Sequence, residues 1–240
     1  MSEDRKSILE KSCRSIGIEL DERQTEQFLT YYDCLIEKNK VMNLTAITEY
    51  EDVVLKHFVD SLSIVQVTDL KQCGTLLDMG TGAGFPGIPL KIVFPHLQIV
   101  LMDSLQKRIQ YLNETIDKLQ LKNIVAVHAR AEEAARKKEY REQFDVCVSR
   151  AVANLSTLSE YCIPFVKKDG LFISYKSKEI DEELKEAKSA VFLLGGKTEE
   201  KKTFELPGSD IGRSFVVIRK VKATSAKYPR KAGMPGKEPL

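Results

Sequence analysis

The stretch Thr75-Leu-Leu-Asp-Met-Gly-Thr-Gly-Ala-Gly-Phe-Pro-Gly87 places a short apolar run and one acid directly before four glycines in eight residues. The apolar run is typical of a buried strand, and the apolar residues after the stretch follow helical spacing with proline near the helix start. Gly80, Gly82 and Gly84 can adopt positive φ and let a ligand approach the backbone. Because the next helix would point free N–H groups at that turn, the stretch predicts a site for a nucleotide-like ligand.

The spacing of the glycines separates two kinds of nucleotide site. The dinucleotide fingerprint G-x-G-x-x-G fails, because Phe85 stands where its third glycine belongs. The frame Asp78-x-Gly80-x-Gly82-x-Gly84 instead resembles the first motif of the Rossmann-like methyltransferases that bind S-adenosylmethionine. In that reading the Asp78 carboxylate holds the cofactor's ammonium directly or through water. The alternative is a glycine-rich turn that only packs.

A second acid follows at the spacing expected for a ribose contact. The apolar run 97–102 predicts a strand that ends in Asp103, 23 residues after Gly80. A carboxylate at this point offers two acceptor oxygens to the vicinal hydroxyls of a ribose. The alternative is an N-cap for a helix that begins near Leu105, and the neighbouring glycine-rich turn favours ribose binding.

The rest of the chain alternates apolar runs and amphipathic segments. We expect further parallel strands at 124–127, 144–148 and 170–175, and a final antiparallel hairpin at 197–206 and 213–220. The predicted fold is therefore α/β and Rossmann-like, the class I S-adenosylmethionine-dependent methyltransferase fold. Its mostly parallel seven-stranded sheet has an antiparallel last strand and carries an N-terminal helical extension.

Composition divides the chain into three parts. Residues 1–70 hold 14 acidic and 8 basic residues and show helical spacing, so we expect an acidic helical cap packed on the core. Residues 71–222 form the methyltransferase domain. Residues 223–240 form a basic tail with little to bury, in which Lys227, Arg230 and Lys231 would contact phosphates and Tyr228 would stack on a base. Solubility alone is the alternative role for this tail.

Side chains that follow the predicted strands are candidates for the rim of the site, because ligands bind at the carboxyl ends of parallel strands. Ala131 and Glu132 follow the strand at 124–127 and would border an adenine. Arg150 follows the strand at 144–148 and would hold the cofactor carboxylate, a phosphate or the acceptor edge of guanine. Structural ion pairing is its alternative. Lys176 ends the next strand and would contact RNA.

Some residue classes argue against other functions. The five cysteines are odd in number and lack C-x-x-C spacing, so we expect reduced core thiols and no metal site. Neither a signal-peptide core nor a stretch of membrane-spanning length is present, and we expect a cytoplasmic protein without a membrane partner. His57 and Asp60 are three residues apart, and a local hydrogen bond is the simpler reading of that spacing. Oligomerisation is not implied.

Taken together, several stretches resemble one family, the glucose-inhibited division protein B (GidB or RsmG) family of bacterial 16S ribosomal RNA guanine-N7 methyltransferases. They are Asn43-Leu44-Thr45, 57–62, 78–89, Asp103-Ser104 with Lys107-Arg108, Arg130-Ala131-Glu132, 149–153 and 228–231. The resemblance implies a cytoplasmic enzyme, S-adenosylmethionine as cofactor, and 16S ribosomal RNA or the small ribosomal subunit as substrate. It also implies cofactor contacts at Gly80, Phe85, Ala131 with Glu132, and Arg150.

The expected chemistry agrees with what the sequence lacks. Guanine N7 already has an in-plane lone pair, so its attack on a sulfonium methyl needs alignment more than a general base. An exocyclic-amine enzyme would more often show Asn/Asp-Pro-Pro-aromatic where Ser149-Arg150-Ala151-Val152 stands. Neither Cys147 nor Cys162 has an evident activating neighbour for nucleophilic catalysis. Two alternatives remain, namely a methyltransferase of this fold acting on another RNA or a small molecule, and a non-catalytic RNA-binding assembly protein.

Overall fold

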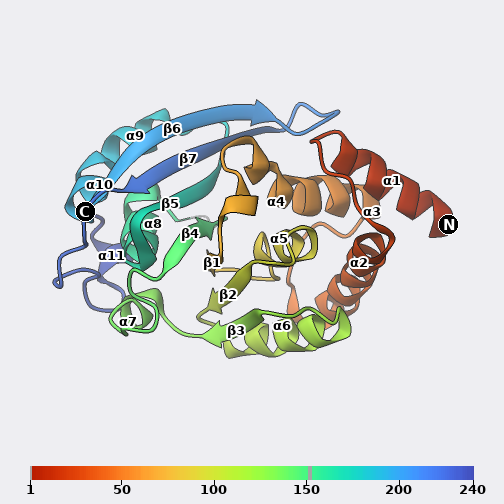
Figure 1. Cartoon of the computed structure of the whole chain (residues 1–240), viewed down its shortest axis with the longest axis horizontal. Helices are drawn as coiled ribbons and strands as arrows, with labels where there is room; N and C mark the ends of the chain where they lie inside the picture. The colour runs from red at the N-terminus through yellow and green to blue at the C-terminus, as the bar shows by residue number, and fades with distance from the viewer. Residues whose placement is uncertain (1, 151–152) are drawn as a thin grey trace.

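A computed structural model describes residues 2–150 and 153–240. It contains a seven-stranded sheet, and helices cover both faces of this sheet (Figure 1). The strand order is β3-β2-β1-β4-β5-β7-β6. Strands β1 to β5 pair in parallel, whereas β7 is antiparallel to both β5 and β6. The expected α/β fold with an antiparallel last strand is confirmed. The strands are β1 (Thr75–Met79), β2 (Gln98–Asp103), β3 (Ile124–His128), β4 (Phe144–Ser149), β5 (Val166–Ser177), β6 (Gly196–Glu205) and β7 (Gly212–Lys220).

Two apolar layers cover the two faces of the sheet. Successive side chains of a strand point to opposite faces, so Leu76 packs with the N-terminal helices while Leu77 packs with the C-terminal ones. In Figure 1 the N-terminal helices lie on one side of the sheet, and the C-terminal segment lies on the other side beside α7 and α8. The helices are α1 (Ser2–Arg14), α2 (Glu22–Met42), α3 (Tyr50–Val53), α4 (Asp60–Leu62), α5 (Gly87–Val93), α6 (Gln106–Lys118), α7 (Ala131–Ala134), α8 (Leu155–Cys162), α9 (Asp181–Glu186), α10 (Lys188–Leu193) and α11 (Met234–Lys237).

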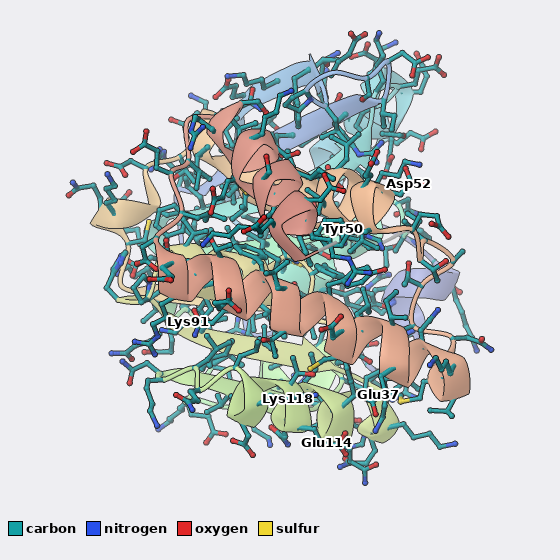
Figure 2. All side chains as sticks on the ribbon, turned by 90° about the vertical axis from the view of Figure 1, so that its right-hand side faces the viewer. Glu37, Tyr50, Asp52, Lys91, Glu114 and Lys118 are labelled. Carbon is teal, nitrogen blue, oxygen red and sulfur yellow. The ribbon has the colours of Figure 1, made fainter. Side chains whose placement is uncertain are left out.

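The N-terminal helices pack directly on α5 and α6. Helix α2 begins at a capping box, in which Asp21 accepts from the Gln24 N–H and the Gln24 side chain accepts from the Asp21 N–H. Figure 2 views this side with α2 crossing in front of the core and Glu37 near Lys118 of α6. Between α3 and α4 a π-helical turn, Val54–Val59, carries the chain without a break. The apolar pattern of the sequence is compatible with either a continuous or a broken helix here, and the structure shows the continuous one.

The C-terminal segment corrects one expectation. The composition of residues 223–240 predicts little to bury, but Tyr228 is only 7% exposed and Pro235 is buried in α11, which packs against α8. The Arg230 guanidinium pairs with Glu160, whose side chain is 1% exposed. The segment is therefore part of the second apolar layer, because its aromatic and its arginine find partners far away in the sequence.

Neither a membrane-spanning helix nor a metal-binding cluster is present in the described part of the chain. No helix among residues 2–150 and 153–240 is long and apolar enough to cross a membrane. Within the same residues, no group of three or more His, Cys, Asp or Glu side chains is arranged to hold a metal ion.

Candidate functional site

A cavity of about 270 Å³ lies where β1, β2 and β3 end. It brings together four of the predicted cofactor residues, Gly80, Asp103, Ala131 and Glu132. Apolar side chains supply surface for a flat base, and polar groups lie at its margin. The remaining lining residues are Met79, Met102, Ser104, Ala129, Arg130, Ser149, Ala153, Leu158, Tyr161 and Gly233. This donor set fits an adenosine-type ligand, since apolar contact and a few placed polar groups are what such cavities use.

The carboxylate of Asp103 is buried at the end of β2 and is already partly engaged. Its Oδ1 accepts from the Leu105 N–H at 2.9 Å, and its Oδ2 accepts from the Gly82 N–H at 3.0 Å and from Arg108 at 3.2 Å. A carboxylate has about four acceptor positions, so one position is open and the half-exposed Arg108 can vacate another. The N-cap of helix α6 is Leu105 and this helix has no side-chain cap, so Asp103 is not its N-cap residue. Ribose binding by Asp103 stays a prediction.

Asp78 lies beneath the glycine-rich turn and not in the cavity. It has no solvent exposure, and its Oδ2 accepts from the Thr81 hydroxyl at 2.6 Å and the Gly87 N–H at 2.8 Å. Its Oδ1 has no hydrogen-bond partner among the described residues. Burial raises the pKa of Asp78 to about 6, against the opposing effect of these two donors. These bonds show that Asp78 shapes the glycine-rich turn. The expectation that Asp78 holds the cofactor's ammonium, directly or through water, stays a prediction.

The glycines of the turn serve different purposes. Gly80 and Gly82 have φ values of 70° and 60°, and a Cβ added at either position would meet no atom closer than 4 Å. Gly84 has a φ of 101°, and a Cβ there would lie 2.5 Å from Ile88 and 2.8 Å from the Tyr31 hydroxyl. The first two glycines leave room for a ligand, whereas the third allows the turn to pack against the helical layer.

Phe85 points away from the cavity toward the N-terminal helices. Its ring stacks on His57 at a centroid distance of 4.6 Å, contacts Tyr31 at 5.2 Å, and lies 5.0 Å from the Arg150 guanidinium carbon. It is 6% exposed. Neither Phe85 nor Arg150 lines the cavity that holds Gly80, Asp103, Ala131 and Glu132. Arg150 lines a neighbouring cleft, and Phe85 packs against Arg150 and His57 of that cleft.

This second hollow, here called the Arg150 cleft, has a volume of about 530 Å³. Its charged side chains are four cations and two carboxylates. The lining residues are Ile47, Lys56, His57, Asp60, Arg150, Tyr175, Lys176, Ser177, Glu183 and Arg213. It adjoins the first cavity, because Ser149 lines one hollow and Arg150 the other, and Lys176 donates to the carbonyl of Ala153, which lines the first. Residues 151 and 152, part of the strand exit singled out in the sequence, lie outside the described residues.

Asp60 is the central residue of the Arg150 cleft. Its Oδ2 accepts from Arg150 at 3.0 Å and its Oδ1 from Arg213 at 3.1 Å, while its side chain is 5% exposed. The arginines come from the end of β4 and the start of β7. Sequence spacing presented Asp60 only as a local partner of His57 and gave no indication of Arg213. The one available signal for Arg213 was its position at the start of a predicted edge strand.

His57 is held neutral in the same network. Burial and then the Arg150 charge lower its pKa to about 3. Its Nδ1 faces Arg150 at 3.4 Å and its Nε2 faces the Thr45 hydroxyl at 2.8 Å. Because arginine can only donate, Nδ1 is the acceptor and Nε2 carries the proton toward Thr45. This contact gives the Asn43–Thr45 stretch a role in orienting the imidazole.

The residues predicted to contact RNA have divergent surroundings. Lys176 is 8% exposed and paired with Glu183 at the Arg150 cleft. Lys227 and Lys231 are exposed. Tyr228 is buried and Arg230 is bound to Glu160, so base stacking by Tyr228 and phosphate binding by Arg230 are not compatible with the structure. The tail instead closes the first cavity, where the Gly233 N–H donates to Glu132 at 2.8 Å.

Comparisons with known proteins agree over almost the whole chain. The family model described as "GidB: rRNA small subunit methyltransferase G" matches residues 24–211. "Ribosomal RNA small subunit methyltransferase G" of Lachnoclostridium phytofermentans is 60% identical over 230 residues, 96% of this chain and 95% of the relative. The protein of the same name from Alkaliphilus metalliredigens is 51% identical over 235 residues, 98% of each chain.

Solved structures resemble the sheet domain at low sequence identity. One is M. jannaschii TYW2 in complex with AdoMet, with a TM-score of 0.52 and 16% identity over 67% of this chain and 73% of that one. The Methanococcus jannaschii fibrillarin pre-rRNA processing protein has a TM-score of 0.52 and 18% identity, covering 65% of this chain and 70% of that one. These likenesses show the fold alone.

Proposed function

The chain belongs to the GidB family, rRNA small subunit methyltransferase G, and from this premise we propose that it transfers a methyl group from S-adenosylmethionine to N7 of a guanosine in 16S ribosomal RNA. The observation that carries the proposal is the pair of adjoining hollows at the carboxyl ends of the strands. The first has the donor set of a nucleoside site and the second is cationic. We also propose that the enzyme works in the cytoplasm, on the small ribosomal subunit or its RNA.

The first cavity supplies the contacts that the cofactor would need. Asp103 would accept from the ribose, the Gly80 turn would face the methionyl part, and Ala131 and Glu132 would border the adenine. When bound, the cofactor supplies a sulfonium methyl as the electrophile. Asp78 would act indirectly, because its bonds to Thr81 and Gly87 hold the turn in shape.

The Arg150 cleft supplies orientation and not proton transfer. Guanine N7 attacks with an in-plane lone pair, and no proton leaves that atom, so alignment and water exclusion contribute most of the rate. The charged groups of the cleft support this reading. Asp60 is bound to two arginines, Glu183 to Lys176, and His57 is neutral with Nδ1 facing Arg150. Arg150 is then the residue that orients the base or its neighbouring phosphate at the border between the hollows.

The decisive experiment is transfer of labelled methyl to small ribosomal subunits from a strain that lacks its own enzyme. Nuclease digestion followed by mass spectrometry should place the label on N7-methylguanosine at one position. Subunits from the parent strain, which already carry the modification, are the matched control and should accept no label. Label on another base atom, or equal labelling of both subunit preparations, would disprove the proposal.

A further inference from the structure

The two arginines of the cleft are held by one carboxylate. Asp60 is 5% exposed, and each of its oxygens accepts from a different guanidinium, Arg150 at 3.0 Å and Arg213 at 3.1 Å. The arginine side chains are 18% and 27% exposed. One negative charge between two positive charges leaves this trio one unit positive at the wall of the cleft.

Two donor atoms of the trio have no hydrogen-bond partner among the described residues. Among the residues that the structure describes, Nη2 of Arg213 and Nε of Arg150 have no hydrogen-bond partner, although Arg213 uses Nε on Asp60 and Nη1 on the Gly212 carbonyl. Both guanidiniums line the same hollow. Their shared anchor fixes them before any ligand arrives, so little side-chain entropy is lost when they bind one.

The net charge of the cleft indicates which kind of ligand it can bind. Lys176 is neutralised by Glu183, Lys56 is paired with Asp52, and His57 is neutral. The surplus is therefore one positive charge, carried by two guanidinium groups on which Nε of Arg150 and Nη2 of Arg213 have no partner among the described residues. A phosphodiester carries one negative charge and accepts several hydrogen bonds at once, which guanidinium groups match better than a single ammonium does.

We propose that Arg150 and Arg213, held together by Asp60, form a clamp for one RNA backbone phosphate next to the target guanosine. This inference rests on the proposed function and adds a substrate contact to it. The clamp lies beside the cofactor cavity without sharing a lining residue with it. It would fix the strand so that the neighbouring base reaches the methyl group, with Asp60 as a positioning residue.

The test compares Arg213→Gln with Arg219→Gln. Both residues are on β7, but Arg219 pairs with Glu199 on the exposed sheet edge and does not line the cleft. Glutamine at position 213 can still donate to Asp60, which limits damage to the fold. For each variant we would measure cofactor binding by calorimetry, binding of unmodified small subunits over a salt series, and steady-state kinetics.

For Arg213→Gln we expect a roughly tenfold weaker affinity for the subunit, since one charge-assisted contact is lost. The slope of log affinity against log salt should fall by about 0.7 to 0.9, the value for one phosphate. KM for the subunit should rise, whereas cofactor affinity and kcat should stay unchanged. Arg219→Gln should match the wild type in every measurement.

Other outcomes decide against the clamp. If a folded, active Arg213→Gln variant keeps the wild-type salt slope, Arg213 makes only a structural ion pair or contacts a base. If the variant binds the cofactor more weakly, the cleft binds the cofactor carboxylate and not an RNA phosphate. If Arg213→Gln does not fold, Arg213→Lys is measured in its place. We expect this variant to keep the wild-type slope of log affinity against log salt and to bind the subunit more weakly. Wild-type affinity for the subunit would contradict the clamp. A wild-type protein without subunit binding or transfer would overturn the proposed function and the clamp together.

Discussion

Asp78 affects stability because its carboxyl group titrates in complete burial. Its pKa is raised to about 6 from 3.8, so between these pH values the folded protein holds a proton that the unfolded chain has released. Stability contributed by that proton is therefore lost as pH rises through the window, by an amount on the order of 3 kcal/mol. We expect Asp78→Asn, which cannot titrate, to lack this loss.

The measurement is urea unfolding of the wild type and Asp78→Asn at several pH values from about 4 to 7. The free energy of unfolding of the variant, relative to that of the wild type, should increase with pH and level off above about pH 6. A difference that does not change with pH would mean that the unpaired Oδ1 is solvated in solution.

His57 is expected to change the stability with pH in the opposite direction to Asp78. Its folded pKa of about 3 lies below the ordinary 6.5, so the unfolded chain binds a proton that the folded protein excludes. The resulting stability is present above about pH 6.5 and is lost as pH falls toward 3. His57→Gln should remove this acid-dependent loss, and the same urea series measures it. If the variant keeps the full acid dependence of the wild type, His57 is not neutral in the fold.

At the level of elements, helix α2 contacts the glycine-rich turn through Tyr31. The Tyr31 hydroxyl donates to the carbonyl of Ala83 at 2.6 Å in a buried position, and its ring packs on Phe85. Tyr31→Phe would leave that carbonyl buried and unpaired, at a cost of about 1 to 3 kcal/mol. Because Ala83 lies within the turn, we also expect a several-fold weaker affinity for S-adenosylmethionine.

Tyr32→Phe is the matched control, since the Tyr32 hydroxyl donates to the carbonyl of Thr48, away from the turn. Calorimetric titration of the cofactor and thermal unfolding of both variants make the comparison. Equal cofactor affinity in the two variants would show that α2 supports the fold without shaping the turn.

Helices and strands that have a clear local sequence pattern could be predicted, and those without one could not. The strands from Thr75–Met79 to Phe144–Ser149 are short apolar runs bounded by turns, and the sequence predicted them to within a residue or two. Helix α8 was not predicted from the sequence. Serines and threonines lie between its apolar residues, so the helical spacing is weak, and Asn154 was not recognised as its N-cap. The π-helical turn at Val54–Val59 has no distinct pattern in the sequence.

Only part of the candidate site could be predicted, because only some of its residues belong to a local sequence pattern. Gly80 and Asp103 belong to a motif with fixed spacing, and they meet at one cavity. The Asp60 trio joins residues 90 and 153 positions apart, and Arg230 reaches Glu160 across 70 positions. Ion pairs over such separations arise from the topology of the sheet, which no local pattern encodes. A basic composition alone therefore misassigned Arg230 to RNA.

In the whole molecule, the C-terminal segment joins the second apolar layer to the first cavity, the proposed cofactor site. Tyr228 fills that layer, Thr224 accepts from the buried Lys220, and Gly233 bonds to Glu132 at the cavity wall. Deleting residues 223–240 would therefore lower stability and cofactor affinity together. Such a deletion cannot separate an RNA substrate from a small-molecule one, and single substitutions at the exposed Lys227 and Lys231 are the better test.

The strength of this attachment can be measured at one ion pair. The Arg230 guanidinium donates to both oxygens of Glu160, whose side chain is 1% exposed. Removing one partner of a buried pair costs about 3 to 5 kcal/mol, because the other charge stays buried, so Arg230→Gln should lower the free energy of unfolding by several kcal/mol. Glu114→Gln, which breaks the exposed pair with Lys38 on the face shown in Figure 2, should cost at most about 1 kcal/mol. Urea unfolding of the two variants gives both values, and similar small losses would mean that the C-terminal segment detaches easily and that Glu160 becomes solvated.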